Sequence, residues 1–200
     1  MGRDTLLTAT LGDQGLLKKT LMVLAGSLFI AAAAKVSVPM WPVPISLQTL
    51  AVLLVGFAMG SRLGALTVGV YLAQGAMGLP VFAPNTMPGL AGLLGPTGGF
   101  LVGFVGLAWL AGLAVERGLA RGAVTTAAAA LVASALLYVP GVLWPMAVAG
   151  AAGIEAVWIG QGAGFYWAHF VGPFLLGDAL KSVIAALVVT GAWAVLTRRG

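Results

Sequence analysis

The chain has 200 residues, of which 60% are hydrophobic and only 8% are charged, and its mean hydropathy is +1.07. A soluble domain has about a quarter of its residues charged, so most of this surface must face something other than water. There is no cysteine and only one histidine, which excludes disulfides, thiolate catalysis and a histidine metal cluster within one chain. We therefore expect a single integral membrane domain over residues 1–200, in contact with lipid, with no metal or cofactor.

Six apolar segments indicate an all-α fold of six transmembrane helices, because each is long enough, with support from its neighbours, to cross a hydrocarbon core about 30 Å thick. The first follows Lys18 and Lys19, and the second and third are joined by a tight turn that predicts an antiparallel hairpin. A cleaved secretory signal is the alternative for the first segment, but its charged leader would be unusually long. The predicted spans are residues 20–38, 45–59, 63–78, 100–115, 124–142 and 174–196.

The basic residues indicate the orientation of these spans. With six spans both termini share a side, and every lysine and arginine except Lys35 and Lys181 falls on that side. Positive residues mark the cytoplasmic face of membrane proteins, so both termini are predicted to be cytoplasmic. The net charge of +5 is thus explained by topology, and we expect no nucleic-acid partner.

The predicted loops differ between the two sides. Those on the cytoplasmic side are short, whereas the external ones, residues 39–44, 79–99 and 143–173, are rich in proline, glycine and apolar residues. Long loops gathered on one face usually line or cover a site. We therefore expect long external loops over a ligand cavity that opens outward.

Two opposite charges, Asp178 and Lys181, lie within the last span, in the stretch GPFLLGDALKSVIAALVVTGAWAVL. Residues three apart share one face of a helix, and a charge inside a membrane costs about 2.5–3.5 kcal/mol on insertion scales. One interpretation is a self-contained ion pair that fixes helix packing. The other is a ligand site, in which Lys181 neutralises an anionic group while Asp178 accepts N–H groups or holds Lys181.

Two amides are further candidates, since an amide offers both donors and an acceptor. Gln48 lies in the apolar stretch ISLQTLAVLL, and Asn85 follows a proline in VFAPNTMPG. The alternatives are an interhelical hydrogen bond for Gln48 and an ordinary turn for Asn85. In the first span, Ser27 and Ala31 lie four apart, a spacing of small residues that allows close helix packing, with a partner or within the bundle.

The glycine-rich stretches do not form a nucleotide site. GPTGG at residues 95–99 is not followed by lysine, and GDALKS at residues 177–182 lacks the second glycine of a P-loop. The glycines of GPTGG are instead expected to let the loop turn and the helices approach. We expect that the protein is not an enzyme, because the sequence shows no evident pair of a catalytic nucleophile and a general base.

Four motifs occur in a fixed order between about residues 35 and 185: PVPISLQTLAVLLVGFAMGSRLGA, YLAQGAMGLPVFA, LLGPTGGFLVGF and GPFLLGDALK. Their combination closely resembles the BioY family, the biotin-binding S components of energy-coupling factor (ECF) vitamin transporters. The resemblance implies six membrane helices, a biotin site near the external face, and a bacterial or archaeal cell (inner) membrane. It also implies partners, namely an ECF transmembrane coupling protein and ATPases, and a homo-oligomer is possible.

The resemblance assigns roles to individual residues. Asp178 and Lys181 match the DxxK motif of the final helix, Gln48 matches the family's QTL, and Asn85 falls in its binding loop, although that loop here reads APNTMPG. Ser27 and Ala31 stand where the family has a small-residue docking pattern, which is only partly kept. The predicted function is a biotin-binding subunit powered by a partner's ATP hydrolysis. The alternatives are a self-sufficient secondary carrier of a small anionic metabolite, a membrane enzyme and a structural subunit.

Overall fold

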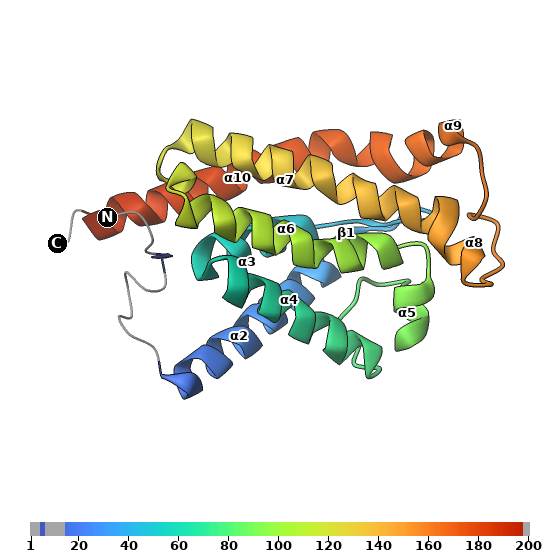
Figure 1. The fold of residues 1–200 in the computed structure, drawn as a ribbon, viewed down its shortest axis with the longest axis horizontal. Coiled ribbons are helices and arrows are strands. Elements are labelled where there is room, and N and C mark those ends of the chain that lie inside the picture. Colours follow the sequence, from blue (N-terminus) through green and yellow to red (C-terminus); the bar gives the residue numbers. More distant parts are fainter. Residues whose placement is uncertain (1–4, 7–14, 198–200) are drawn as a thin grey trace.

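The computed structural model describes residues 5–6 and 15–197, which are mostly helical (Figure 1). The long helices are α2 (Leu16–Lys35), α3 (Gln48–Met59), α4 (Ser61–Ala76), α6 (Gly98–Glu116), α7 (Ala123–Leu143) and α10 (Gly172–Thr197). Shorter helical segments are α5 (Leu90–Leu94), η1 (Leu119–Arg121), η2 (Trp144–Val148), α8 (Ala149–Ala151), α9 (Ala163–Tyr166) and η3 (Trp167–Val171). Two short strands, β1 (Ser37–Val38) and β2 (Ile45–Ser46), pair antiparallel.

A long helix lies at each of the six predicted spans. In the described part of the chain, four helical stretches are long and apolar enough to cross a membrane, namely residues 16–35, 98–116, 123–151 and 163–196. Helix α3 is apolar but shorter, so it relies on its neighbours. The count of six membrane spans and the cytoplasmic side of the termini stay predictions.

Helix α6 lies in the middle of the bundle and contacts α3, α4 and α7. Figure 1 shows α7 and α10 side by side on one flank of α6, with α2 and α4 on the opposite flank. The contact between α6 and the α3–α4 turn is close, because a Cβ added to Gly112 would overlap the backbone of Gly60 and Ser61. The Glu116 carboxylate accepts hydrogen bonds from the backbone N–H and hydroxyl of Ser61, both at 2.8 Å, and so caps the start of α4.

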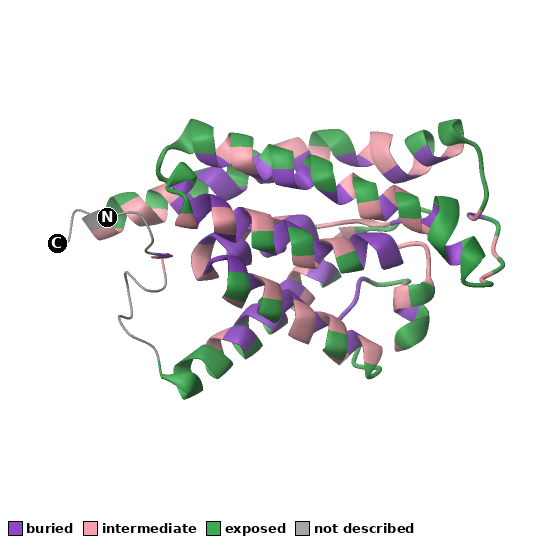
Figure 2. Ribbon diagram, viewed as in Figure 1, coloured by how far each residue is buried: buried purple, intermediate pink, exposed green. Residues whose placement is uncertain are grey.

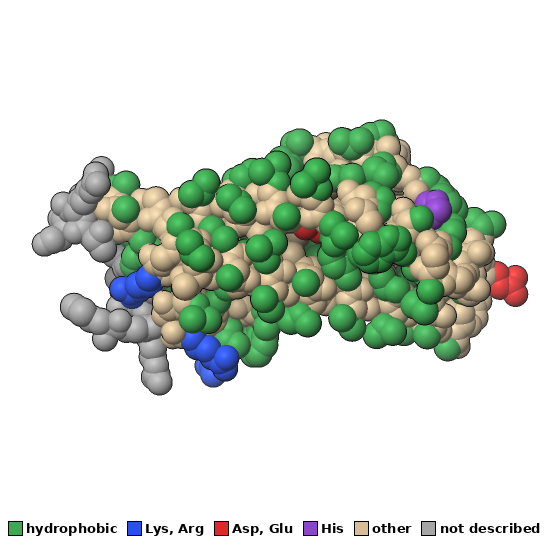
Figure 3. All heavy atoms as spheres, turned by 90° about the horizontal axis from the view of Figure 1, so that it is seen from above, with side chains coloured by type: hydrophobic (Ala, Val, Ile, Leu, Met, Phe, Trp, Pro, Cys, Tyr) green, Lys and Arg blue, Asp and Glu red, His purple; other side chains and the backbone are tan. Residues whose placement is uncertain are grey.

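The outer surface of the bundle is apolar. Figure 2 shows buried residues facing inward and exposed ones facing outward along the long helices, and in Figure 3 hydrophobic side chains cover the visible face while lysine and arginine gather towards one end. Exposed leucines such as Leu28, Leu136 and Leu187 lie on three different helices. In water such a surface would be unfavourable, whereas lipid tails accommodate it.

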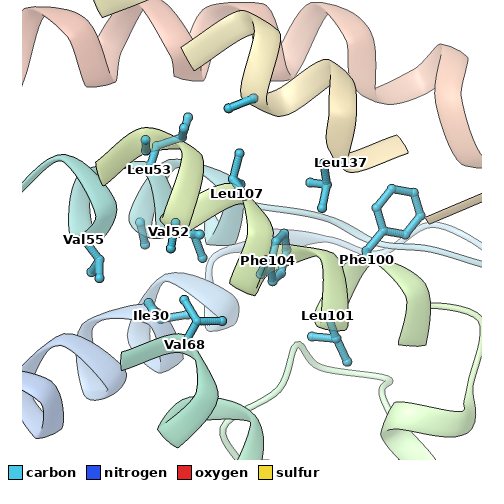
Figure 4. Packing of buried hydrophobic residues seen from close by; sticks show 14 of the residues in the cluster. Ile30, Val52, Leu53, Val55, Val68, Phe100, Leu101, Phe104, Leu107 and Leu137 are labelled. Atoms are coloured by element: carbon cyan, nitrogen blue, oxygen red, sulfur yellow. The ribbon is translucent and has the colours of Figure 1, made fainter. Parts of the chain in front are cut away.

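The core lies between α3 and α6 and continues to α2, α4 and α7 (Figure 4). Val52 and Leu53 of α3 and Leu107 of α6 are at most 2% exposed. Towards one end of α6, the buried Phe100 and Phe104 belong to this core and also form a wall of the pocket described below. The same helix therefore supports both the packing and the site.

The predicted third external loop, residues 143–173, contains more helix than expected. Proline commonly ends a helix, but α7 contains Pro140 and continues through the π-helical η2, which contains Pro145, into α8. The wider π turn lets Ala149 donate its N–H to the carbonyl of Trp144, five residues back, so the helical bonding pattern passes the prolines. A second π turn, η3, leads into α10.

Candidate ligand-binding site

A pocket lies between α3, α6, α7 and α10, beside the strand segment that carries Ser46 and the loop that carries Ala83. Its free space, counted together with its opening, is about 540 Å³. Most of its wall is apolar, with Phe100, Phe104 and Phe174 among the contributors. The polar side chains on it include Gln48, Thr49, Thr97, Tyr138, Asp178 and Lys181. An apolar pocket with a few placed polar groups is the usual form of a small-molecule site.

The predicted charged pair lies in this pocket. Lys181 Nζ is 3.0 Å from Asp178 Oδ1, and both side chains are only 8% exposed. One turn of α10 brings the two together, as their spacing predicted. Removing either partner of a buried ion pair would leave an uncompensated buried charge, which is strongly destabilising.

Tyr138 completes this cluster, although the sequence did not single it out. Tyr138 lies on α7, forty residues before Asp178 in the chain, and its hydroxyl donates a hydrogen bond to Asp178 Oδ2 at 2.7 Å. Each carboxylate oxygen of Asp178 thus accepts one hydrogen bond, Oδ1 from Lys181 and Oδ2 from Tyr138. The Ser182 hydroxyl donates to the Asp178 backbone carbonyl at 2.7 Å. Lys181 has three N–H donors, and among the described residues only Asp178 accepts from it. Two donors therefore remain for a bound molecule.

Gln48 begins α3 and is 5% exposed. Its amide nitrogen donates to the Tyr71 hydroxyl at 2.6 Å and its amide oxygen accepts from the Ser46 hydroxyl at 3.0 Å. Tyr71 in turn donates to the Val81 carbonyl at 3.2 Å. The network fixes the Gln48 side chain, which makes an interhelical hydrogen bond to Tyr71 and also lines the pocket.

Asn85 does not reach the charged pair. It is exposed, has a left-handed backbone with φ of 69°, and lines an adjoining outer hollow with Trp41 and Met87. The two cavities share Pro44, Thr86 and Thr97, so the hollow leads to the mouth of the pocket. Asn85 is thus placed at the approach to the inner pocket and not on its wall.

The sequence matches the BioY family over residues 5–198. The chain belongs to the BioY family. A protein of Pyrococcus horikoshii named probable biotin transporter BioY is 33% identical over 81% of this chain and 90% of its own length. The biotin transporter BioY of Rhodobacter capsulatus is 36% identical over 84% of this chain and 89% of its own. The fold is similar to a crystal structure described as the S-component for biotin from an ECF-type ABC transporter, with a TM-score of 0.67, 21% identity, and coverage of 89% of this chain and 93% of that one.

The two small residues predicted to contact a partner lie differently in this BioY-family structure. Ser27 is fully buried, and its hydroxyl accepts a hydrogen bond from the Gln74 amide at 3.2 Å. Ser27 therefore faces α4 inside the bundle in this structure, and its contact with a partner stays a prediction. Ala31 is half-buried and packs against the core, and its role with a partner stays a prediction.

Proposed function

We propose that this chain is the biotin-binding membrane subunit of an uptake system and binds biotin in the pocket between α3, α6, α7 and α10. Two observations support this: membership of a family whose curated relatives are named biotin transporters, and the buried Asp178–Lys181 pair within an apolar pocket. The pair is the observation that carries the proposal. A charged side chain inside a membrane protein faces a partner or a ligand, because placing it against lipid costs free energy.

The chemistry of the pocket suits biotin, which has a carboxylate, a ureido ring and an apolar body. In the proposed complex the free N–H groups of Lys181 bind the carboxylate, because the ammonium is the cation on the pocket wall. Asp178 already accepts from Lys181 and Tyr138, so its role is to hold those two donors in place. The ureido group would then lie away from Lys181 in the pocket, whose wall also carries Gln48, and the apolar body would pack against the phenylalanine side chains. Binding uses no metal or cofactor.

We further propose that uptake is powered by a partner. The chain carries no P-loop motif, so the energy would come from the ATPases and the transmembrane coupling protein of an ECF transporter. The protein would lie in the bacterial or archaeal inner membrane, with both termini cytoplasmic, alone or as a homo-oligomer. A self-sufficient carrier of small anions is the alternative, and uptake that follows an ion gradient without any ATPase would favour it.

The test of the proposed function is equilibrium binding of radiolabelled biotin to the purified protein in detergent. We expect saturable binding that unlabelled biotin displaces and that an unrelated carboxylate vitamin, such as nicotinate, does not. A wild-type protein that is folded but takes up no label would overturn the proposal.

Replacing Tyr138 by phenylalanine should weaken biotin binding about tenfold, because a hydrogen bond to a charged group contributes about 1.5–3 kcal/mol and Asp178 would lose a donor. The measurement is the Kd of labelled biotin. Tyr166→Phe is the control, since Tyr166 is more deeply buried than Tyr138 and donates to the Pro145 carbonyl outside the pocket. It should lower thermal stability without changing the Kd. An unchanged Kd in Tyr138→Phe would show that its hydroxyl serves packing alone.

A further inference from the structure

The turn before α6, GPTGG at residues 95–99, holds a buried hydroxyl without a hydrogen-bond partner. Thr97 is half-buried as a residue, but its Oγ1 is fully buried, and no atom of the described residues pairs with it. Thr97 stands at the start of α6, where a threonine side chain commonly caps the helix, yet it makes no capping bond. Buried polar groups nearly always have partners, so this orphan requires an explanation.

The position of Thr97 suggests what its partner is. Thr97 lines the inner pocket together with Lys181, and it also lines the outer hollow together with Asn85. It therefore lies where the two cavities meet. Its helix continues inward as Phe100 and Phe104, which form the pocket wall, so a molecule that extends outward from Lys181 along this wall meets Thr97.

The surrounding backbone fixes this residue in place. A Cβ on Gly98 would overlap the carbonyl of Leu93 in α5, and a Cβ on Gly99 would overlap the carbonyl of Pro140 in α7. On the other side of the turn, the Trp144 indole N–H donates to the Gly95 carbonyl at 2.9 Å. The turn is thus held between two helices and an indole ring. A contact residue held in this way loses little freedom on binding, which favours affinity.

We propose that Thr97 contacts the ligand directly, and that its hydroxyl makes a hydrogen bond to the polar end of the ligand that lies away from Lys181. A hydroxyl both donates and accepts, so it fits a ureido carbonyl or a ureido N–H equally. This inference rests on the proposed function and assigns one more specificity residue to the same site. It also gives the GPTGG turn a role beyond close helix packing.

The experiment measures the Kd of labelled biotin for the wild type and for four variants of the purified protein. Thr97→Val keeps the shape and removes the hydroxyl, and Thr97→Ala removes it without a bulky replacement. Both should raise the Kd about tenfold, the effect of one lost hydrogen bond whose partner stays buried. Thr97→Ser keeps the hydroxyl and should stay within about twofold. Thr125→Val makes the same change at an exposed threonine of α7 that bonds the Gly122 carbonyl, and should leave the Kd unchanged.

Thermal unfolding of the ligand-free variants accompanies these measurements. If Thr97→Val or Thr97→Ala is folded and binds biotin as tightly as the wild type, the inference is wrong, and water or packing explains the buried hydroxyl. If Thr97→Ser loses as much affinity as the hydroxyl-free variants, the methyl group matters and the proposed hydrogen bond is likewise rejected. A wild type that binds no biotin would instead reject the proposed function, so the two failures are distinguishable.

Discussion

Replacing Lys181 by methionine should raise the Kd for biotin about 100-fold or more. Methionine keeps an unbranched apolar stem but removes the ammonium, which is the proposed partner of the ligand carboxylate. Truncating one member of a buried charge pair typically costs 2–5 kcal/mol, partly because the other charge is left unpaired. Here Asp178, with a side chain 8% exposed, would retain only the Tyr138 hydroxyl on its carboxylate. The Kd of labelled biotin in detergent is the measurement.

Two further variants separate binding from folding. Lys19→Met makes the same change at an exposed lysine near the start of α2 and should bind biotin normally. Asp178→Asn combined with Lys181→Met removes both charges, so thermal stability should recover relative to the single variant while binding stays lost. If Lys181→Met is less stable yet binds biotin with the wild-type Kd, the pair serves helix packing and the ligand lies elsewhere.

The charged pair was predictable from the sequence because its two residues are close together in the chain. Asp178 and Lys181 are three apart in an apolar helix, and helix geometry alone places them together. Tyr138 was not predictable in the same way, since its contact with Asp178 depends on how α7 packs against α10. Thr97 stands within a motif that was interpreted as a turn. The glycines of the motif do allow that turn. That the Thr97 hydroxyl is buried without a hydrogen-bond partner depends on the atoms packed around it, which the sequence does not show.

Ser27 shows why the spacing of small residues alone does not indicate which face of α2 is available to a partner. Residues 27 and 31 share a face of α2 whichever way the helix is turned, and in a membrane both its lipid face and its bundle face are apolar. The pattern of hydrophobic residues therefore does not indicate which face packs inward. In the structure the Ser27 face packs against α4, through Gln74. Similarly, hydropathy located the six long helices but gave no sign that π turns would extend two of them beyond their prolines.

Replacing Gly99 by alanine should disturb both the fold and the site, although the change adds a single methyl group. That methyl would overlap the Pro140 carbonyl and lie close to Trp144, so α6 and α7 would have to move apart. Overpacking of this kind typically costs 1–3 kcal/mol, and we expect a melting temperature lower by about 5 °C. Because α6 carries Phe100 and α7 carries Tyr138, separating the helices would also widen the pocket and weaken biotin binding by about tenfold or more.

Gly106 offers a matched control within α6. A Cβ there would have no neighbour within 4 Å, and the position is exposed on the outer surface. Gly106→Ala should therefore bind biotin with the wild-type Kd and be at least as stable, since alanine is the better helix former. The two variants make the same chemical change on one helix, so any difference between them reports the α6–α7 contact. If Gly99→Ala bound biotin with the wild-type Kd, the spacing of α6 and α7 would not control the pocket, and the close approach of these helices would serve stability alone.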